Sequence, residues 1–317
     1  MKQSFPPKIR SICSQSKENK LALHLPRVWN YRCSYCIQGA TKVSSFSEPF
    51  FDNQRISVIN KIVSRFHIQQ LSLMGGEPTL IDLYPLFEAL TKPVKRILII
   101  TNFSRSNEYF IKLNTLARSK GSEIWLICSL HEEFVDYKKF VAKVNDLHLS
   151  GYERIRIEFV VARSNLKQAK DIIAYIQTHS NPQIGLAIDF DYNDQSIKRK
   201  YEIENLVSNN NSTKNLVVNY DDGSTEIKSI QELRLFQMPT GEKYCFTNLT
   251  LKENYDLFLC ERKLFNFKGE SFADLDKISN IETFKCNISD CMFCYEPRIF
   301  FNLNDAITAI NDFDLNS

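Results

Sequence analysis

Two short stretches of this chain carry residues suited to chemistry. Cys33 and Cys36 are separated by two residues, and thiolates at this spacing ligate iron–sulfur clusters or zinc, although a lone pair is more often buried or half of a zinc site. Further along, the chain reads Gly75-Gly76-Glu77-Pro78. Glycines permit a close backbone approach, and carbonyl oxygens together with Glu77 accept hydrogen bonds from an ammonium group. Alone, the first stretch is compatible with a metal site and the second with a turn before a helix.

The elements around these stretches predict a barrel. Strand-like stretches alternate with stretches of helical period, and the strands are expected at 21–25, 71–75, 96–101, 123–130, 154–162 and 185–192. Strands separated by helices pair in parallel through right-handed crossovers and close fully or partly into a barrel. Ligands of such barrels bind at the carboxyl ends of the strands. Both chemical stretches follow a predicted strand, which is where this rule places them.

A strand, a cysteine loop, a helix and a strand ending in Gly-Gly-Glu-Pro resemble the opening of a radical S-adenosylmethionine (SAM) enzyme. That family's loop reads Cys-x3-Cys-x2-Cys, and this chain matches it except that Trp29 stands at the first cysteine. The resemblance implies an α/β fold with a partial (β/α)6 barrel and a [4Fe–4S] cluster that binds SAM. It also implies reductive cleavage of SAM to a 5′-deoxyadenosyl radical, a peptide or small-molecule substrate, and an electron donor such as a flavodoxin or ferredoxin.

The resemblance assigns roles to individual positions. The residues expected to hold the cluster or SAM are Cys33, Cys36, Tyr35, Gly75, Gly76, Glu77, Pro78, Asn102 and Ser129. The cysteines would hold iron, Gly-Gly-Glu-Pro would receive the methionine part of SAM, and the other three would contact its adenosyl part. Phe103 stands where the family has a glycine. His131 closes a Ser-Leu-His stretch, and as a lone histidine after a strand it is expected to satisfy a local hydrogen bond.

Trp29 bears on whether the chain can perform this chemistry. An indole nitrogen is only a donor and cannot ligate iron, so a cluster held by two thiolates would be labile or absent and the activity impaired. The chain could then be an inactive relative that binds SAM, or a non-catalytic protein that recognises a partner. Alternatively His24 or Cys13 supplies the third ligand, or Cys33 and Cys36 hold zinc with outside ligands.

Five of the nine cysteines gather near the C-terminus. This clustering favours metal ligation over disulfides, because the cytosol keeps thiols reduced. A hairpin predicted at 248–252 and 256–259 precedes most of them, and the arrangement resembles the twitch or SPASM-type extension of radical SAM proteins. The resemblance implies an auxiliary [4Fe–4S] cluster, with zinc as the alternative. The candidates for four ligand positions are Cys245, Cys260, Cys286, Cys291 and Cys294.

Bulk properties set the remaining expectations. The chain has 317 residues, which allows one large domain and a small appended one. We expect an N-terminal arm over 1–20, the barrel over 21–230, and the cysteine-rich extension with a closing helix over 231–317. A net charge of +3 is too balanced to indicate a nucleic-acid partner. No apolar run approaches the ~20 residues of a membrane span, and no signal peptide is evident, so a cytoplasmic location is expected.

Overall fold

The computed structural model describes residues 8–14, 18–36, 41–42, 49–191, 215–229, 243–246, 249–259, 262–268, 285–286, 298–300 and 304–308. The chain forms two compact units. The barrel unit comprises Leu23–Asn60 and Gln70–Asn211, and the second unit comprises Met1–Ala22, Lys61–Gln69 and Ser212–Ser317. The domain boundaries expected at residues 20 and 230 stay predictions.

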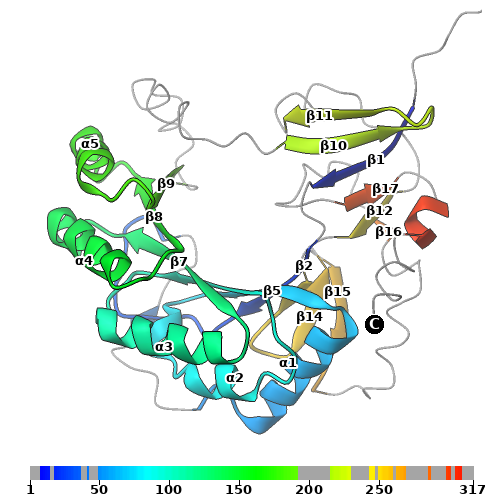
Figure 1. Ribbon diagram of the computed structural model, residues 1–317, viewed down its shortest axis with the longest axis horizontal. Coiled ribbons are helices and arrows are strands. Elements are labelled where there is room, and N and C mark those ends of the chain that lie inside the picture. Colours follow the sequence, from blue (N-terminus) through cyan, green and yellow to red (C-terminus); the bar gives the residue numbers. More distant parts are fainter. Residues whose placement is uncertain are drawn as a thin grey trace, which may run out of the picture. The chain divides into compact units, whose positions relative to one another are not determined.

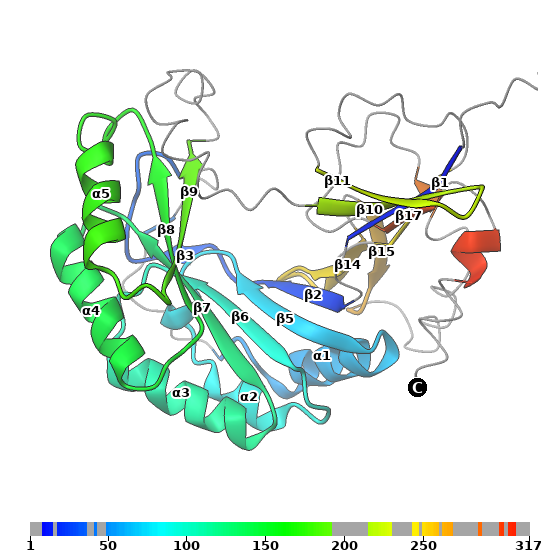
Figure 2. The ribbon, with the colours of Figure 1, turned by 45° about the horizontal axis from the view of Figure 1, so that its top comes forward.

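The barrel unit is built on a curved sheet whose strands run in the order β2-β5-β6-β7-β8-β9 (Figures 1 and 2). Their bounds are β2 (Asn19–His24), β5 (Ile68–Met74), β6 (Arg96–Thr101), β7 (Glu123–Leu130), β8 (Ile155–Val161) and β9 (Gly185–Phe190). Strands β5 to β9 pair in parallel. All six predicted strands are therefore confirmed, as is the α/β partial barrel. A short parallel pair, β3 (Val28–Trp29) and β4 (Thr41–Lys42), lies beside the cysteine loop in the sequence.

Helices connect the strands and cover the outer face of the sheet (Figure 2). They are α1 (Asn53–Arg65), the 3₁₀ turn η1 (Pro78–Leu80), α2 (Tyr84–Ala89), α3 (Asn107–Ser119), α4 (Tyr137–Leu149) and α5 (Ala169–His179). The side chains of Ser106 and Asp136 accept from backbone N–H groups at the starts of α3 and α4, which fixes where these helices begin. None of the helices in the described ranges is long and apolar enough to cross a membrane.

Alternation along the strands separates the two faces of the sheet. Leu130 of β7 and Phe159 of β8 lie beside each other in register and are buried under the helices. Ser129 and Glu158 are the preceding pair, so their side chains lie together on the opposite, inner face. At the carboxyl ends of β7 and β8 the inner face is therefore the more polar one.

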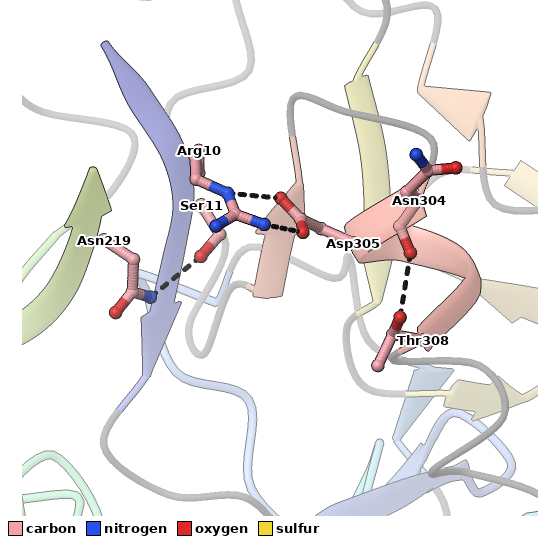
Figure 3. Close-up of polar contacts among 6 residues, drawn as sticks. All are labelled: Arg10, Ser11, Asn219, Asn304, Asp305 and Thr308. Atoms are coloured by element: carbon pink, nitrogen blue, oxygen red, sulfur yellow. Dashed lines mark hydrogen bonds and ion pairs between the residues drawn. The ribbon is translucent and has the colours of Figure 1, made fainter. Parts of the chain in front are cut away.

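The second unit contains a six-stranded sheet in the order β11-β10-β1-β17-β12-β16. The bounds are β1 (Ile9–Ser14), β10 (Asn215–Tyr220), β11 (Thr225–Ser229), β12 (Lys243–Phe246), β16 (Lys285–Cys286) and β17 (Arg298–Phe300). The segment expected to be an N-terminal arm thus supplies a strand. Figure 3 shows how it is held: Arg10 pairs with Asp305 of a helical stretch at 304–308, and Asn219 Nδ2 donates to Ser11 Oγ at 2.8 Å.

The predicted C-terminal hairpin is confirmed as β13 (Leu249–Leu251) and β14 (Asp256–Leu259), followed by β15 (Arg262–Asn266). Its turn contains Tyr255 at φ 69, a left-handed conformation that usually favours glycine. Cys245 and Cys286 lie on the antiparallel strands β12 and β16. Cys260, Cys291 and Cys294, and the remainder of the predicted closing helix, lie outside the described residues, so the auxiliary metal site stays a prediction.

Candidate active site

The predicted site residues gather at one edge of the parallel sheet. Gly-Gly-Glu-Pro follows β5, Asn102 follows β6, and His131 follows β7, and these strands are neighbours in the sheet. The segment after β2 joins them through backbone hydrogen bonds. Leu25 N donates to Met74 O at 2.8 Å, and Glu77 N donates to Val28 O at 2.7 Å. The segment that leads into the cysteine loop is therefore attached directly to the Gly-Gly-Glu-Pro turn.

Nearby backbone atoms leave no space for a side chain at either glycine of this turn. A Cβ atom at Gly75, where φ is +138, would lie 2.6 Å from Leu25 O. A Cβ atom at Gly76 would lie 2.1 Å from Val28 O and 2.8 Å from Pro26 O. All of these contacts are with backbone, which cannot turn aside as a side chain can. The predicted role of the glycines in receiving SAM is untested, but the structure adds a packing reason for their presence.

Glu77 is buried and joins the ends of two strands. Its Oε1 accepts from Thr79 N at 3.0 Å, from Thr79 Oγ1 at 2.5 Å and from Thr101 Oγ1 at 2.6 Å. Its Oε2 accepts from Asn102 N at 2.6 Å. Burial raises the pKa of Glu77 above its ordinary value, although these hydrogen bonds oppose the shift. The sequence analysis did not select either threonine, although both donate hydrogen bonds to Glu77.

Asn102 and Phe103 form a tight turn after β6. Asn102 Nδ2 donates to Asn30 Oδ1 of the cysteine loop at 2.6 Å, which makes a second link between that loop and the strand ends. Phe103 has φ 57, so it keeps a left-handed conformation at the position where the family has glycine. Its buried ring stacks on Phe110 with centroids 4.9 Å apart, and Lys143 Nζ donates to its carbonyl oxygen at 2.7 Å. Packing therefore stabilises a backbone conformation that phenylalanine rarely adopts.

The cysteine loop closes onto His131. Cys33 Sγ lies 3.0 Å from His131 Nδ1, and Tyr35 Oη lies 3.0 Å from the same nitrogen. Burial raises the pKa of Cys33 to about 12, with the charge of Glu133 adding to the shift. Burial lowers the pKa of His131 to about 4. At neutral pH the pair is thus a neutral thiol beside a neutral imidazole.

This placement corrects the expectation for His131. Its partners are two residues of the cysteine loop, nearly one hundred positions upstream, rather than a neighbour in the sequence. Tyr31 adds to the same contact, because it packs edge-on to His131 and stacks on Phe134 with centroids 4.9 Å apart. The Ser-Leu-His stretch was the signal, but only the fold shows what lies opposite it.

Further contacts hold the loop in place. Ser34, between the two cysteines, donates its backbone N–H to Glu133 Oε2 at 2.9 Å and its hydroxyl to the same carboxylate. Ser164, after β8, also donates to Glu133, at 3.2 Å. Asn165 Nδ2 donates at 2.7 Å to Oε1 of Glu132, the residue that precedes Glu133. The loops after β7 and β8 therefore fix the cysteine loop over the sheet.

A carboxyl pair on the inner face was not anticipated from the sequence. Burial raises the pKa of Glu158 to about 7, and a hydrogen bond with Asp189 and the charge of that residue contribute further. Glu158 is in register with Ser129, one of the predicted SAM contacts. The pair can share a proton near neutral pH and can accept hydrogen bonds from a cationic or hydroxyl-bearing ligand.

The donor set fits the expected cluster only in part. Cys33 and Cys36 are half-buried thiols whose pairing is fixed by Cys36 N donating to Cys33 O at 3.2 Å. Trp29 lies in β3 and offers no lone pair. Within the described residues, no three His, Cys, Asp or Glu side chains are arranged as they stand to hold a metal ion. Of the alternatives to Trp29, Cys13 lies within β1, paired with Val217 and Arg298, and His24 is the last residue of β2; ligation by either stays a prediction.

Comparisons with known proteins find two curated relatives and a similar solved fold, although no family model matches the chain. The chain is 25% identical over 168 residues, 49% of its length, to a probable GTP 3′,8-cyclase of Metallosphaera sedula. It is 23% identical over 154 residues, 45% of its length, to a GTP 3′,8-cyclase of Pasteurella multocida. The chain spans about half the length of these curated relatives, since the matches cover 50% and 45% of them.

A solved structure, native anSMEcpe with bound AdoMet, has a similar fold. Its TM-score is 0.52 at 13% identity, and the match covers 94% of this chain and 97% of that chain. At this identity the likeness shows the fold alone.

Proposed function

We propose that this chain is a radical SAM-type protein that binds SAM at the carboxyl edge of its barrel and acts on a peptide or small molecule. One observation carries the proposal. The segment that leads into the cysteine loop is joined to the Gly-Gly-Glu-Pro turn by Glu77 N, which donates to Val28 O at 2.7 Å. This adjacency supports the proposal, because SAM chemistry at a cluster needs a metal-binding loop beside a turn that accepts the amino group of SAM.

Each part of the site has a task in this proposal. Cys33 and Cys36 hold a [4Fe–4S] cluster which, when bound, supplies the electron that cleaves SAM to a 5′-deoxyadenosyl radical. Gly75 to Pro78 receive the methionine part of SAM, and Tyr35, Asn102 and Ser129 receive the adenosyl part. The electron comes from a small donor protein of the flavodoxin or ferredoxin class. An auxiliary [4Fe–4S] cluster, or zinc, is held by four of the five C-terminal cysteines.

Trp29 makes this protein a weak catalyst in our proposal. The loop lacks the thiolate that would stand at position 29, so the cluster would be bound more weakly or would have a different reduction potential. Each rise of about 59 mV in the potential of a one-electron donor lowers its equilibrium reducing power tenfold. The peptide or small-molecule substrate is set by side chains on the inner face, where the Glu158–Asp189 pair favours a ligand with a donor group.

The test compares three proteins after anaerobic reconstitution with iron, sulfide and reductant: the parent, Trp29→Cys and Trp29→Ser. Serine has nearly the shape of cysteine but supplies no thiolate, which makes it the matched control. SAM binding is measured by equilibrium dialysis, and 5′-deoxyadenosine by mass spectrometry. We expect all three to bind SAM and Trp29→Cys to form 5′-deoxyadenosine at least about tenfold faster than the other two, which corresponds to about 1.4 kcal/mol.

Two results would count against the proposal. If neither the parent nor Trp29→Cys binds SAM or forms 5′-deoxyadenosine, the site does not serve this chemistry. If the parent is as fast as Trp29→Cys, its activity is not impaired.

A second candidate is a non-catalytic protein that uses the barrel pocket or the cysteine-rich unit to recognise a partner. The hydrogen-bonded contact of Cys33 with His131 favours it, because the loop is ordered by the protein's own groups. SAM binding without 5′-deoxyadenosine, even in Trp29→Cys, would support this candidate.

A further inference from the structure

We propose that Asn30 of the cysteine loop is a positioning residue for SAM, because it holds the side-chain amide of Asn102 so that one Nδ2 hydrogen is left to donate to the ligand. The inference rests on the proposed function, since it takes Asn102 to contact the adenosyl part of SAM. The experiment below separates the failure of the inference from the failure of that function.

Two partners determine the orientation of the Asn102 amide. Ser104 N donates to Asn102 Oδ1 at 3.1 Å, and only the oxygen of an amide accepts such a bond. The nitrogen is therefore the atom that faces Asn30, and Nδ2 donates to Asn30 Oδ1 at 2.6 Å. Each bond alone assigns the same atom as oxygen and the same atom as nitrogen, so the hydrogen-bond network fixes the orientation.

One hydrogen of this amide is left over. An asparagine NH₂ group carries two donors, and Asn30 accepts from one of them. Within the part of the chain that the structure describes, no group accepts from the other, although Asn102 is only 6% exposed. Buried donors are nearly always paired, so a leftover donor favours an acceptor that a ligand supplies. The adenosyl part supplies such acceptors, because the ring nitrogens N3 and N7 of adenine accept hydrogen bonds.

The backbone of Asn102 is held by other groups. Its N–H donates to Glu77 Oε2 at 2.6 Å, and Lys143 Nζ donates to the carbonyl oxygen of the next residue, Phe103, at 2.7 Å. Neither bond involves the cysteine loop. Asn30 therefore acts on the side chain of Asn102 alone, and the end of β6 keeps its place when Asn30 is substituted.

Loss of Asn30 would free the amide to turn. Without Asn30 Oδ1, the side chain of Asn102 keeps a single partner, Ser104 N, and the amide plane can rotate about that bond. A rotated amide no longer presents its leftover N–H in one direction, so part of the affinity for an acceptor on the ligand is lost. The donor that SAM meets thus depends on a residue of the loop that also carries Cys33 and Cys36.

Equilibrium dialysis of SAM tests the inference on the full-length chain, reconstituted as for the Trp29 variants. Asn30→Leu removes the acceptor at similar side-chain size, and Asn30→Asp keeps an acceptor at the same place. We expect Asn30→Leu to raise the dissociation constant of SAM about three- to tenfold, the usual effect of one hydrogen bond. Asn30→Asp should stay within about twofold of the parent, and urea unfolding checks that each variant is folded.

A matched control and a double variant distinguish positioning from a general effect on structure. Asn145 of α4 likewise donates to a carbonyl, His179 O at 2.8 Å, and accepts from a backbone N–H, that of Asn181, at 2.9 Å. Asn145→Leu should therefore bind SAM like the parent. In Asn102→Leu, which has no amide to position, adding Asn30→Leu should weaken SAM binding no further.

Three results overturn the inference while the parent still binds SAM and the proposed function stands. In the first, Asn30→Leu binds SAM as tightly as the parent. In the second, Asn30→Asp binds as weakly as Asn30→Leu, and in the third, Asn30→Leu weakens binding equally in the Asn102→Leu background. If neither the parent nor Trp29→Cys binds SAM, the proposed function fails and the inference fails with it.

Discussion

Gly76 gives the sharpest test of how the turn and the cysteine loop are joined. In Gly76→Ala, the new Cβ atom would lie 2.1 Å from Val28 O, well inside the 3.4 Å at which ordinary contact begins. Val28 N and Pro26 O would be 2.6 and 2.8 Å away, so no rotation within the segment avoids all three atoms. The segment and the turn must therefore move apart by roughly 1 Å.

This movement has an energetic cost that can be estimated. Overpacking of a filled site costs about 1–3 kcal/mol. The movement also breaks the hydrogen bond from Glu77 N to Val28 O and leaves a buried donor unsatisfied, which costs about 1–3 kcal/mol more. We therefore expect Gly76→Ala to lower the free energy of unfolding by roughly 3 kcal/mol and to weaken SAM binding, because the turn no longer abuts the loop.

The measurement is urea unfolding followed by tryptophan fluorescence, together with SAM dialysis. Gly185→Ala is the matched control, because its new Cβ atom would meet only the Arg156 side chain, at 3.4 Å. We expect this control to change stability by less than about 0.5 kcal/mol. If Gly76→Ala is as stable as Gly185→Ala and binds SAM like the parent, the turn does not pack on the loop as described.

Two further predictions concern single side chains. Phe103→Gly removes the strain of a left-handed phenylalanine, about 1 kcal/mol, but also removes a buried ring that contributes about 3–5 kcal/mol. We therefore expect urea unfolding to show a free energy of unfolding lower by roughly 2–4 kcal/mol. A higher free energy of unfolding would contradict this. For Glu158, a folded-state pKa raised from 4.5 to about 7 means that the folded protein binds more protons, so stability falls as pH rises through this window. Between those pH values, the free energy of unfolding of the parent should fall by up to about 3 kcal/mol relative to that of Glu158→Gln, as measured by urea unfolding. If the free energies of the two proteins change with pH in parallel, the Glu158–Asp189 pair is not protonated as described.

The sequence predicted the strands and the order of the motifs, because alternation and strand-end signatures are local properties. It did not predict the packing that explains the residue type at Gly76 and at Phe103. Gly76 is explained by backbone atoms of Pro26 and Val28, and the contact follows from how β2 meets β5. Phe103 was recognised as replacing a glycine, but its φ of 57 and the ring of Phe110 that stabilises it depend on packing.

His131 shows the limit of sequence reasoning most clearly. A lone histidine after a strand has no periodicity or spacing that would reveal its partner. The partner, Cys33, becomes visible only when β7 and the loop after β2 meet at one edge of the sheet. Glu133 and Ser164 are similar, since each contacts Ser34 across more than ninety positions of chain.

The hydrogen bonds between Ser34 and Glu133 bear on the thermodynamics of cofactor assembly. Ordering the backbone of one residue opposes binding by about 1–2 kcal/mol of conformational entropy, and a cluster loop that is random before loading meets this cost at every position. Here Ser34 is already held between the two cysteines when the protein folds. In the proposed function, the residue between the two cysteines is thus ordered before a cluster binds, and less conformational entropy is lost on binding.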